Sequence, residues 1–94
     1  MFSSPSCGTC QQFEREVGDR YARTNDGKRI PLHRIGLHTP RPPQLAIIAE
    51  VRGTPTFVLL DADKEIGRIT GYSGDELFWM RFAALVADLP LSLQ

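Results

Sequence analysis

The chain is poor in cysteine and has no excess of charge of either sign. It has two cysteines in 94 residues, and eleven basic and eleven acidic side chains give a formal net charge of zero. A small disulfide-stapled secreted scaffold usually carries about four cysteines or more, so that class is excluded. No run of like charge exceeds two residues. The basic footprint of a nucleic-acid-binding protein is therefore missing, and we expect no nucleic-acid partner.

Long hydrophobic runs are missing as well. No apolar run approaches the roughly 20 residues that a transmembrane helix needs, so we expect no membrane insertion. The first residues also lack the charged and apolar regions of an export signal. With 41% apolar residues the chain can nevertheless bury a core. Its length is typical of one domain, which we expect to span residues 1–94.

Hydrophobic periodicity predicts alternating strands and helices. Cys10, Phe13, Val17 and Tyr21 recur at intervals of three to four residues, which indicates one face of a helix. The expected elements are a strand at Met1–Ser3, a helix from Gly8 to about Asn25, a strand at Ile30–Leu37, a helix at Gln44–Val51, strands at Thr56–Leu60 and Glu65–Thr70, and a last helix ended by Pro90. The order β-α-β-α-β-β-α predicts an α/β fold in which helices cover both faces of a mixed four-stranded sheet.

Two short patterns predict where helices begin and end. Asn25-Asp26-Gly27 tolerates the left-handed conformation and is expected to end the first helix. Ser73-Gly74-Asp75-Glu76 has the S-x-x-E form of a capping box and is expected to open the last helix, with Ser73 as the cap.

Cys7-Gly8-Thr9-Cys10 lies where a predicted strand ends and a helix begins. The first turn of a helix has unpaired N–H groups and the positive end of the macrodipole, and both favour a thiolate over a thiol. The thiolate is the nucleophile of disulfide exchange. We therefore predict that Cys7 is the exposed attacking sulfur and that Cys10, one turn on and facing inward, resolves the mixed disulfide. Gly8 leaves room for another chain.

Two other functions fit the same cysteines. Cys7 and Cys10 with His33 and His38 form a conceivable zinc or copper set, although 22 residues separate Cys10 from His33, more than the roughly 12–15 of a zinc finger. A small zinc fold also depends on its metal because it lacks a core, and this chain has one. The second alternative is a non-catalytic binding module, which has little need for both cysteines.

A second landmark is Val51-Arg52-Gly53-Thr54-Pro55-Thr56-Phe57, directly before an apolar strand and about 45 residues after the C-x-x-C pair. Together the two motifs resemble the thioredoxin superfamily, and the similarity extends over the whole chain. The start M-F-S-S-P-S-C and the segment G-Y-S-G-D-E-L are most similar to small periplasmic bacterial thioredoxins of the sulfur-oxidation (SoxS) type.

The resemblance implies a thioredoxin fold and a thiol–disulfide oxidoreductase without cofactor or metal. Thr54–Pro55 should be a cis peptide packed beside Cys7, and Gly8, Thr9, Thr54 and Pro55 should form the substrate-binding surface. The partners implied are protein thiols or disulfides, with a membrane reductant upstream. We expect a monomer that keeps partner thiols reduced in the periplasm, with the cytoplasm as the alternative.

Several positions depart from the family pattern. C-G-T-C stands in place of C-G-P-C, and the buried acid and its lysine partner would fall at Met1 and near Leu32. Proton transfer to Cys10 then needs water or another group, such as Glu14 or a histidine. The strand before Pro5 is also short, since strands usually run about 5–6 residues. On that ground we expect the natural chain to start upstream.

Overall fold

The structure, a computed structural model, describes residues 1–62 and 64–90. In chain order its elements are β1 (Phe2–Ser3), α1 (Gly8–Phe13), a π-helical segment (Glu14–Gly18), α2 (Asp19–Tyr21), α3 (Asn25–Arg29), β2 (Ile35–Gly36), a 3-10 turn (Pro43–Leu45), β3 (Thr56–Asp61), β4 (Lys64–Thr70) and α4 (Asp75–Ala87). The four strands form one sheet in the order β2-β1-β3-β4. β1 runs parallel to β2 and antiparallel to β3, which confirms the mixed sheet.

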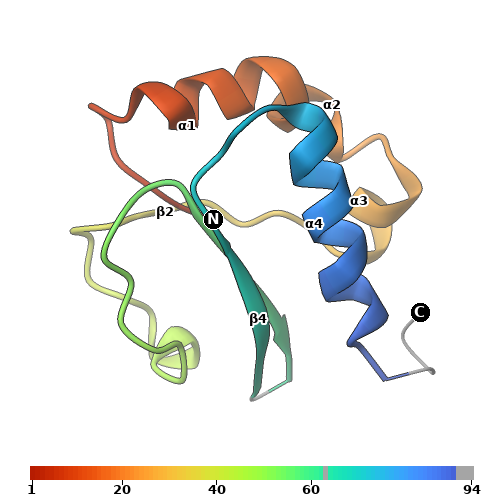
Figure 1. The fold of residues 1–94 in the computed structure, drawn as a ribbon. Helices are drawn as coiled ribbons and strands as arrows, with labels where there is room; N and C mark the ends of the chain where they lie inside the picture. Colours follow the sequence, from red (N-terminus) through yellow and green to blue (C-terminus); the bar gives the residue numbers. More distant parts are fainter. Residues whose placement is uncertain (63, 91–94) are drawn as a thin grey trace.

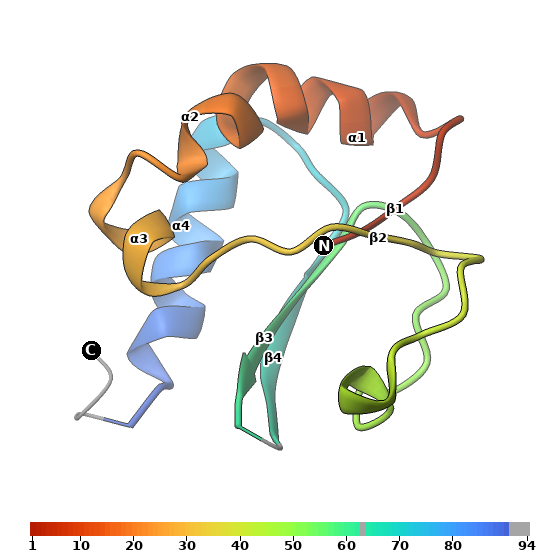
Figure 2. The same cartoon turned by 180° about the vertical axis from the view of Figure 1, so that it is seen from behind.

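The sheet separates two apolar clusters. On one face, α1 and α4 pack together around Phe13, as the two opposite views show (Figures 1 and 2). On the other face, Phe2 packs with Ile48 and Val51 of the irregular segment that precedes β3. The α-helices α1 and α4 thus cover the first face, and on the second face the helical element is the 3-10 turn Pro43–Leu45, whose Leu45 packs against the cluster of Phe2. Within the described residues, no helix has the length and apolar character needed to cross a membrane.

The helix predicted at Gln44–Val51 is wrong: only the 3-10 turn Pro43–Leu45 forms there. Arginine side chains from elsewhere bind the carbonyls of this segment. Arg41 Nη1 donates to the carbonyl of Ile48 at 2.7 Å, and Arg68 Nη1 donates to that of Glu50 at 3.0 Å. The carbonyls are thus satisfied without helical bonds, and Ile48 remains buried.

The first helix begins at Gly8 as predicted but ends at Tyr21, after a π-helical segment in its middle. Asn25-Asp26-Gly27 does not end it, because Asn25 instead starts the separate helix α3. Thr24 caps α3: its hydroxyl oxygen accepts a hydrogen bond from the Gly27 N–H at 2.9 Å. Sequence reasoning missed this cap, whose short polar side chain is one of those preferred at helix starts.

Two further boundaries differ from the prediction. The strand expected at Ile30–Leu37 is reduced to β2, since its neighbour β1 offers only two residues for pairing and Pro31 has no N–H to donate. The last helix forms, but its N-cap is Gly74 at φ 100° without a side-chain cap, so the predicted Ser73 cap is wrong. A positive φ of this size suits glycine, which has no Cβ to clash.

Candidate active site

Three loops meet at one end of the sheet, where β1 and β4 end and β3 begins. β1 runs through Ser3 into the loop that carries Cys7, and β3 starts directly after Pro55. β4 ends where Thr70 pairs with Thr56, and the Gly71 N–H donates to the Pro55 carbonyl at 2.8 Å. Because the ends of these strands are neighbours in the sheet, the loops 4–7, 53–55 and 71–74 lie together (Figure 1).

Cys7 and Cys10 are joined by a disulfide, with their Cα atoms 5.2 Å apart. Cys7 is the N-cap of α1, and its sulfur accepts a hydrogen bond from the Cys10 N–H at 3.0 Å. Thr9 Oγ1 lies 3.5 Å from the same sulfur. Cys7 is half-buried, whereas Cys10 is 4% exposed and belongs to the core around Phe13. The two sulfurs therefore differ in access and in the number of hydrogen-bond donors around them.

The proline motif adopts the predicted geometry. The Thr54–Pro55 peptide is cis, as expected. Pro55 is fully buried and Thr54 half-buried, while the Thr56 hydroxyl donates to the Gly53 carbonyl at 2.7 Å and holds the turn. The direct packing of Pro55 against Cys7 stays a prediction.

The surroundings of Cys10 are apolar. Met1 and Leu32, at the positions of the family's acid and lysine, pack in or against the same cluster as Cys10. Glu14, a candidate for proton transfer, is bound by the Arg34 guanidinium through two hydrogen bonds of 2.6 and 2.8 Å. Its carboxylate is thereby held by the residue that directly precedes β2.

Tyr72 connects the loop 71–74 to the first helix, a contact that the sequence did not reveal. Its hydroxyl donates to Glu16 Oε1 at 2.5 Å, and Gln12 Nε2 donates to the other oxygen at 3.2 Å. These two hydrogen bonds lower the pKa of the Glu16 carboxyl, and burial raises the pKa of Tyr72 above its usual range. The residues are 56 positions apart. No local pattern could have indicated the pair.

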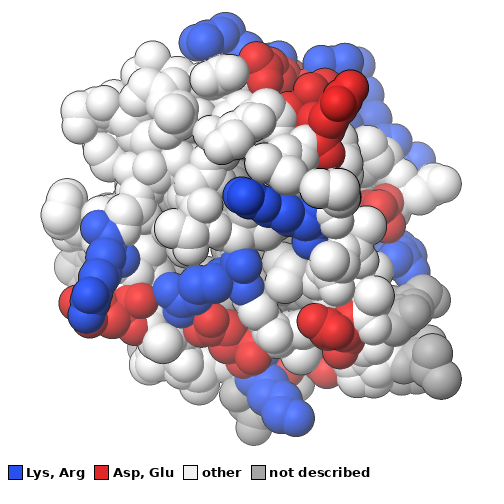
Figure 3. Space-filling model, in the orientation of Figure 1, with Lys and Arg blue, Asp and Glu red and all other residues white. Residues whose placement is uncertain are grey.

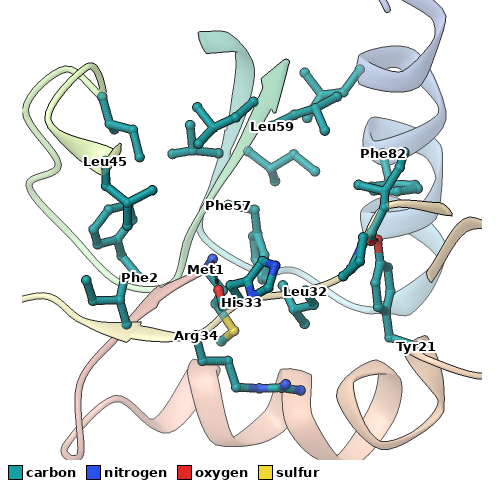
Figure 4. Close-up of a pocket in the computed structure, with 18 of the residues that line it drawn as sticks. Met1, Phe2, Tyr21, Leu32, His33, Arg34, Leu45, Phe57, Leu59 and Phe82 are labelled. Atoms are coloured by element: carbon teal, nitrogen blue, oxygen red, sulfur yellow. Dashed lines mark hydrogen bonds between the residues drawn. The ribbon is translucent and has the colours of Figure 1, made fainter. Parts of the chain in front are cut away.

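A cavity of about 810 Å³ lies away from the cysteines. It runs between β3 and the segment that precedes β2. In the close-up, Phe2 and Leu45 line one side and Tyr21 and Phe82 the other, with Leu59 between them (Figure 4). Neither cysteine is among its lining residues. Cys7 and Cys10 therefore lie outside this cavity, at the end of the sheet where the three loops meet.

Nothing in the structure gathers the ligands of the metal-binding alternative. His33 and His38 are exposed, and the two cysteine sulfurs are bonded to each other. Across residues 1–62 and 64–90, no three His, Cys, Asp or Glu side chains are placed to hold a metal ion.

A C-x-x-C disulfide at the start of a helix, with a cis-proline before the neighbouring strand, defines a thiol–disulfide oxidoreductase of the thioredoxin fold. The family of thioredoxin-like domains matches residues 1–85, and the chain belongs to this family. Among solved structures, the reduced form of the periplasmic thioredoxin SoxS from Paracoccus pantotrophus is 38% identical. The match covers 94% of this chain and 93% of that one, with a TM-score of 0.88. The resemblance to SoxS-type thioredoxins is thereby confirmed, although no curated protein matches the chain.

Proposed function

We propose that this chain, as one domain of residues 1–94, reduces disulfides of protein partners through Cys7 and Cys10 and keeps the partner thiols reduced. The observation that carries the proposal is the Cys7–Cys10 disulfide at the start of α1, with Cys7 half-buried and Cys10 buried in the core. We further propose that the protein acts in the periplasm and is itself reduced by a membrane reductant. The similarity to periplasmic SoxS supports this location.

The chemistry takes two exchange steps. The Cys7 thiolate attacks one sulfur of the partner disulfide, a mixed disulfide forms, and the other partner sulfur leaves as a thiolate that takes up a proton. The Cys10 thiolate then attacks Cys7 Sγ, which releases the second partner sulfur and closes the Cys7–Cys10 disulfide. Two electrons pass from the cysteine pair to the partner, and a donor of two electrons must reduce the pair again.

The neighbouring residues support these steps. The Cys10 N–H, which donates to Cys7 Sγ at 3.0 Å, stabilises a negative charge on that sulfur. Gly8 and Thr9 are exposed beside Cys7 and leave space for a partner segment. Thr54 and Pro55 form the second side of the proposed substrate surface. Because apolar side chains surround Cys10 and Arg34 binds Glu14, we assign the proton transfer at Cys10 to water.

A redox titration tests the proposal. The protein is equilibrated in buffers of dithiothreitol or glutathione at graded potentials, and its free thiols are alkylated and counted by mass. We expect a reversible two-electron transition of Cys7 and Cys10. A midpoint nearer about −270 mV than about −120 mV supports the reducing direction. An oxidising midpoint overturns the direction, and the absence of any transition overturns the function.

Thr9 offers a test of how Cys7 is activated. Its hydroxyl lies 3.5 Å from Cys7 Sγ, and a disulfide sulfur can only accept, so the hydroxyl is the donor. We expect Thr9→Val to have a smaller thiolate fraction at Cys7 and therefore a several-fold slower reaction of the reduced protein with iodoacetamide below neutral pH. Thr9→Ser, which keeps the hydroxyl, serves as the control. Equal rates for the valine and serine variants would show that the hydroxyl plays no part.

A further inference from the structure

The rim around Cys7 carries no charged side chain. The loops at this end of the sheet belong to three stretches of sequence, residues 1–13, 53–60 and 70–74, and none contains Lys, Arg, Asp or Glu. Together these stretches supply 26 residues, whereas charged side chains make up 23% of the whole chain. The neutrality of this rim is therefore a local property of the site and does not follow from a low charge content of the protein.

Charged side chains lie next to this rim, and on the side of β4 Arg68 and Arg81 line a surface hollow together with Thr70. Figure 3 shows an uncharged area at the upper left, over the start of α1, with charged side chains below it over the loop before β3. Directly before the loop 53–55 stands Arg52, whose side chain forms an ion pair with Glu50 at 3.3 Å. Both side chains are largely exposed. Beside the loop 71–74, Glu16 is bound by Tyr72, and Asp75 accepts a hydrogen bond from a backbone N–H of its own helix turn.

The rim offers neutral groups to a partner. Ser6, Gly8, Thr9, Gly53 and Ser73 are exposed, and they present hydroxyls, backbone amides and space. An extended peptide can pair with such groups through its own backbone. A charged side chain next to the partner's cysteine would lose part of its hydration on docking and would meet no opposite charge, which is unfavourable for either sign.

We propose that this rim selects partner segments whose residues on both sides of the reactive cysteine are uncharged, and that docking does not depend on electrostatic steering. This inference rests on the proposed reductase function and names its substrate class. The zero net charge of the chain agrees with it, because no long-range field of one sign attracts or repels a partner.

The test uses short peptides that each hold one cysteine as a mixed disulfide with 2-mercaptoethanol. The cysteine is flanked by Gly and Ser, by Lys, or by Glu. Rates of reduction by the reduced protein are divided by the rates with dithiothreitol, which removes the effect of the flanks on the leaving thiol. We expect the neutral peptide to react roughly tenfold faster than both charged ones. Its rate should change less than about twofold between ionic strengths of about 0.02 and 0.5 M. Equal rates, or a charged peptide that reacts faster, would overturn the inference.

A neutral small disulfide, bis(2-hydroxyethyl) disulfide, distinguishes a failure of the reductase function from a failure of the selectivity. If the reduced protein fails to react with it, the reductase function itself is wrong. If it reacts but the peptides show no penalty for charge, only the selectivity is wrong. Ser6→Lys should make the Glu peptide faster than the Lys peptide. The matched control is Ala83→Lys on the exposed side of α4, which should leave their ratio unchanged.

Discussion

Cys7→Ser is expected to lower disulfide exchange to background, roughly a thousandfold or more, with the fold intact. A serine hydroxyl stays protonated near neutral pH and does not attack a disulfide. The Cys7 sulfur, by contrast, accepts a hydrogen bond from the Cys10 N–H at 3.0 Å and lies at the start of α1, and both features favour its thiolate. The measurement is the rate of reduction of a protein disulfide such as that of insulin, with circular dichroism to show that the variant is folded.

Cys10→Ser is the matched control because it removes the buried sulfur and keeps the accessible one. It should form the mixed disulfide with the partner but release it slowly, so that a covalent complex accumulates and is seen by intact mass. The reverse pattern, in which Cys7→Ser accumulates the mixed disulfide and Cys10→Ser does not react with the partner, would interchange the roles of the two cysteines.

Phe13→Ala should lower the free energy of unfolding by about 3–5 kcal/mol, the range for a buried phenylalanine. Phe13 is 0% exposed, and its ring centroid lies 4.7 Å from that of Phe57 and 5.1 Å from that of Phe78. Truncation leaves a cavity at the point where α1, β3 and α4 meet. Since small proteins are stable by only about 5–15 kcal/mol, the variant should be close to unfolding at room temperature.

Urea unfolding of the oxidised protein measures this effect. Phe13→Leu keeps most of the side-chain volume and should lower the free energy of unfolding clearly less than Phe13→Ala does. Met80 on α4 is 66% exposed, so Met80→Ala should change the free energy of unfolding by no more than about 0.5 kcal/mol. If Phe13→Ala were as mild as Met80→Ala, the aromatic cluster would not be the centre of the core.

The local features of the site could be predicted because they depend on residues close together in sequence. Cys7 and Cys10 are three positions apart, so a helix that starts between them separates them by about one turn and places Cys10 on the apolar face with Phe13. The cis form of Thr54–Pro55 was predicted from the family resemblance and not from the residues alone. The strand Thr56–Leu60 was predicted almost to its ends, because a continuous apolar run suits a strand that is covered on both faces.

The errors arose where distant side chains compete with local preference. Gln44–Val51 has the composition of a helix, but Arg41 and Arg68 bind two of its carbonyls and Ile48 packs under the sheet, so a 3-10 turn and an irregular segment form instead. The cap at Thr24 was missed for a different reason: the first helix ends at Tyr21, before the predicted end near Asn25, and Thr24 lies outside it as the cap of α3.

By itself, the sequence determined the C-x-x-C pair, its place at the start of a helix and most of the order of strands and helices, since each of these follows from spacing within a few residues. The helix predicted at Gln44–Val51 is the exception. The tertiary structure decided which loops share one end of the sheet. Pairing of Phe2 with Thr56 and of Thr56 with Thr70 brings the loops of Cys7, Pro55 and Tyr72 together. The pairing of Phe2 with Thr56 and the contact of Tyr72 with Glu16 join residues more than fifty positions apart, and no local spacing specifies them.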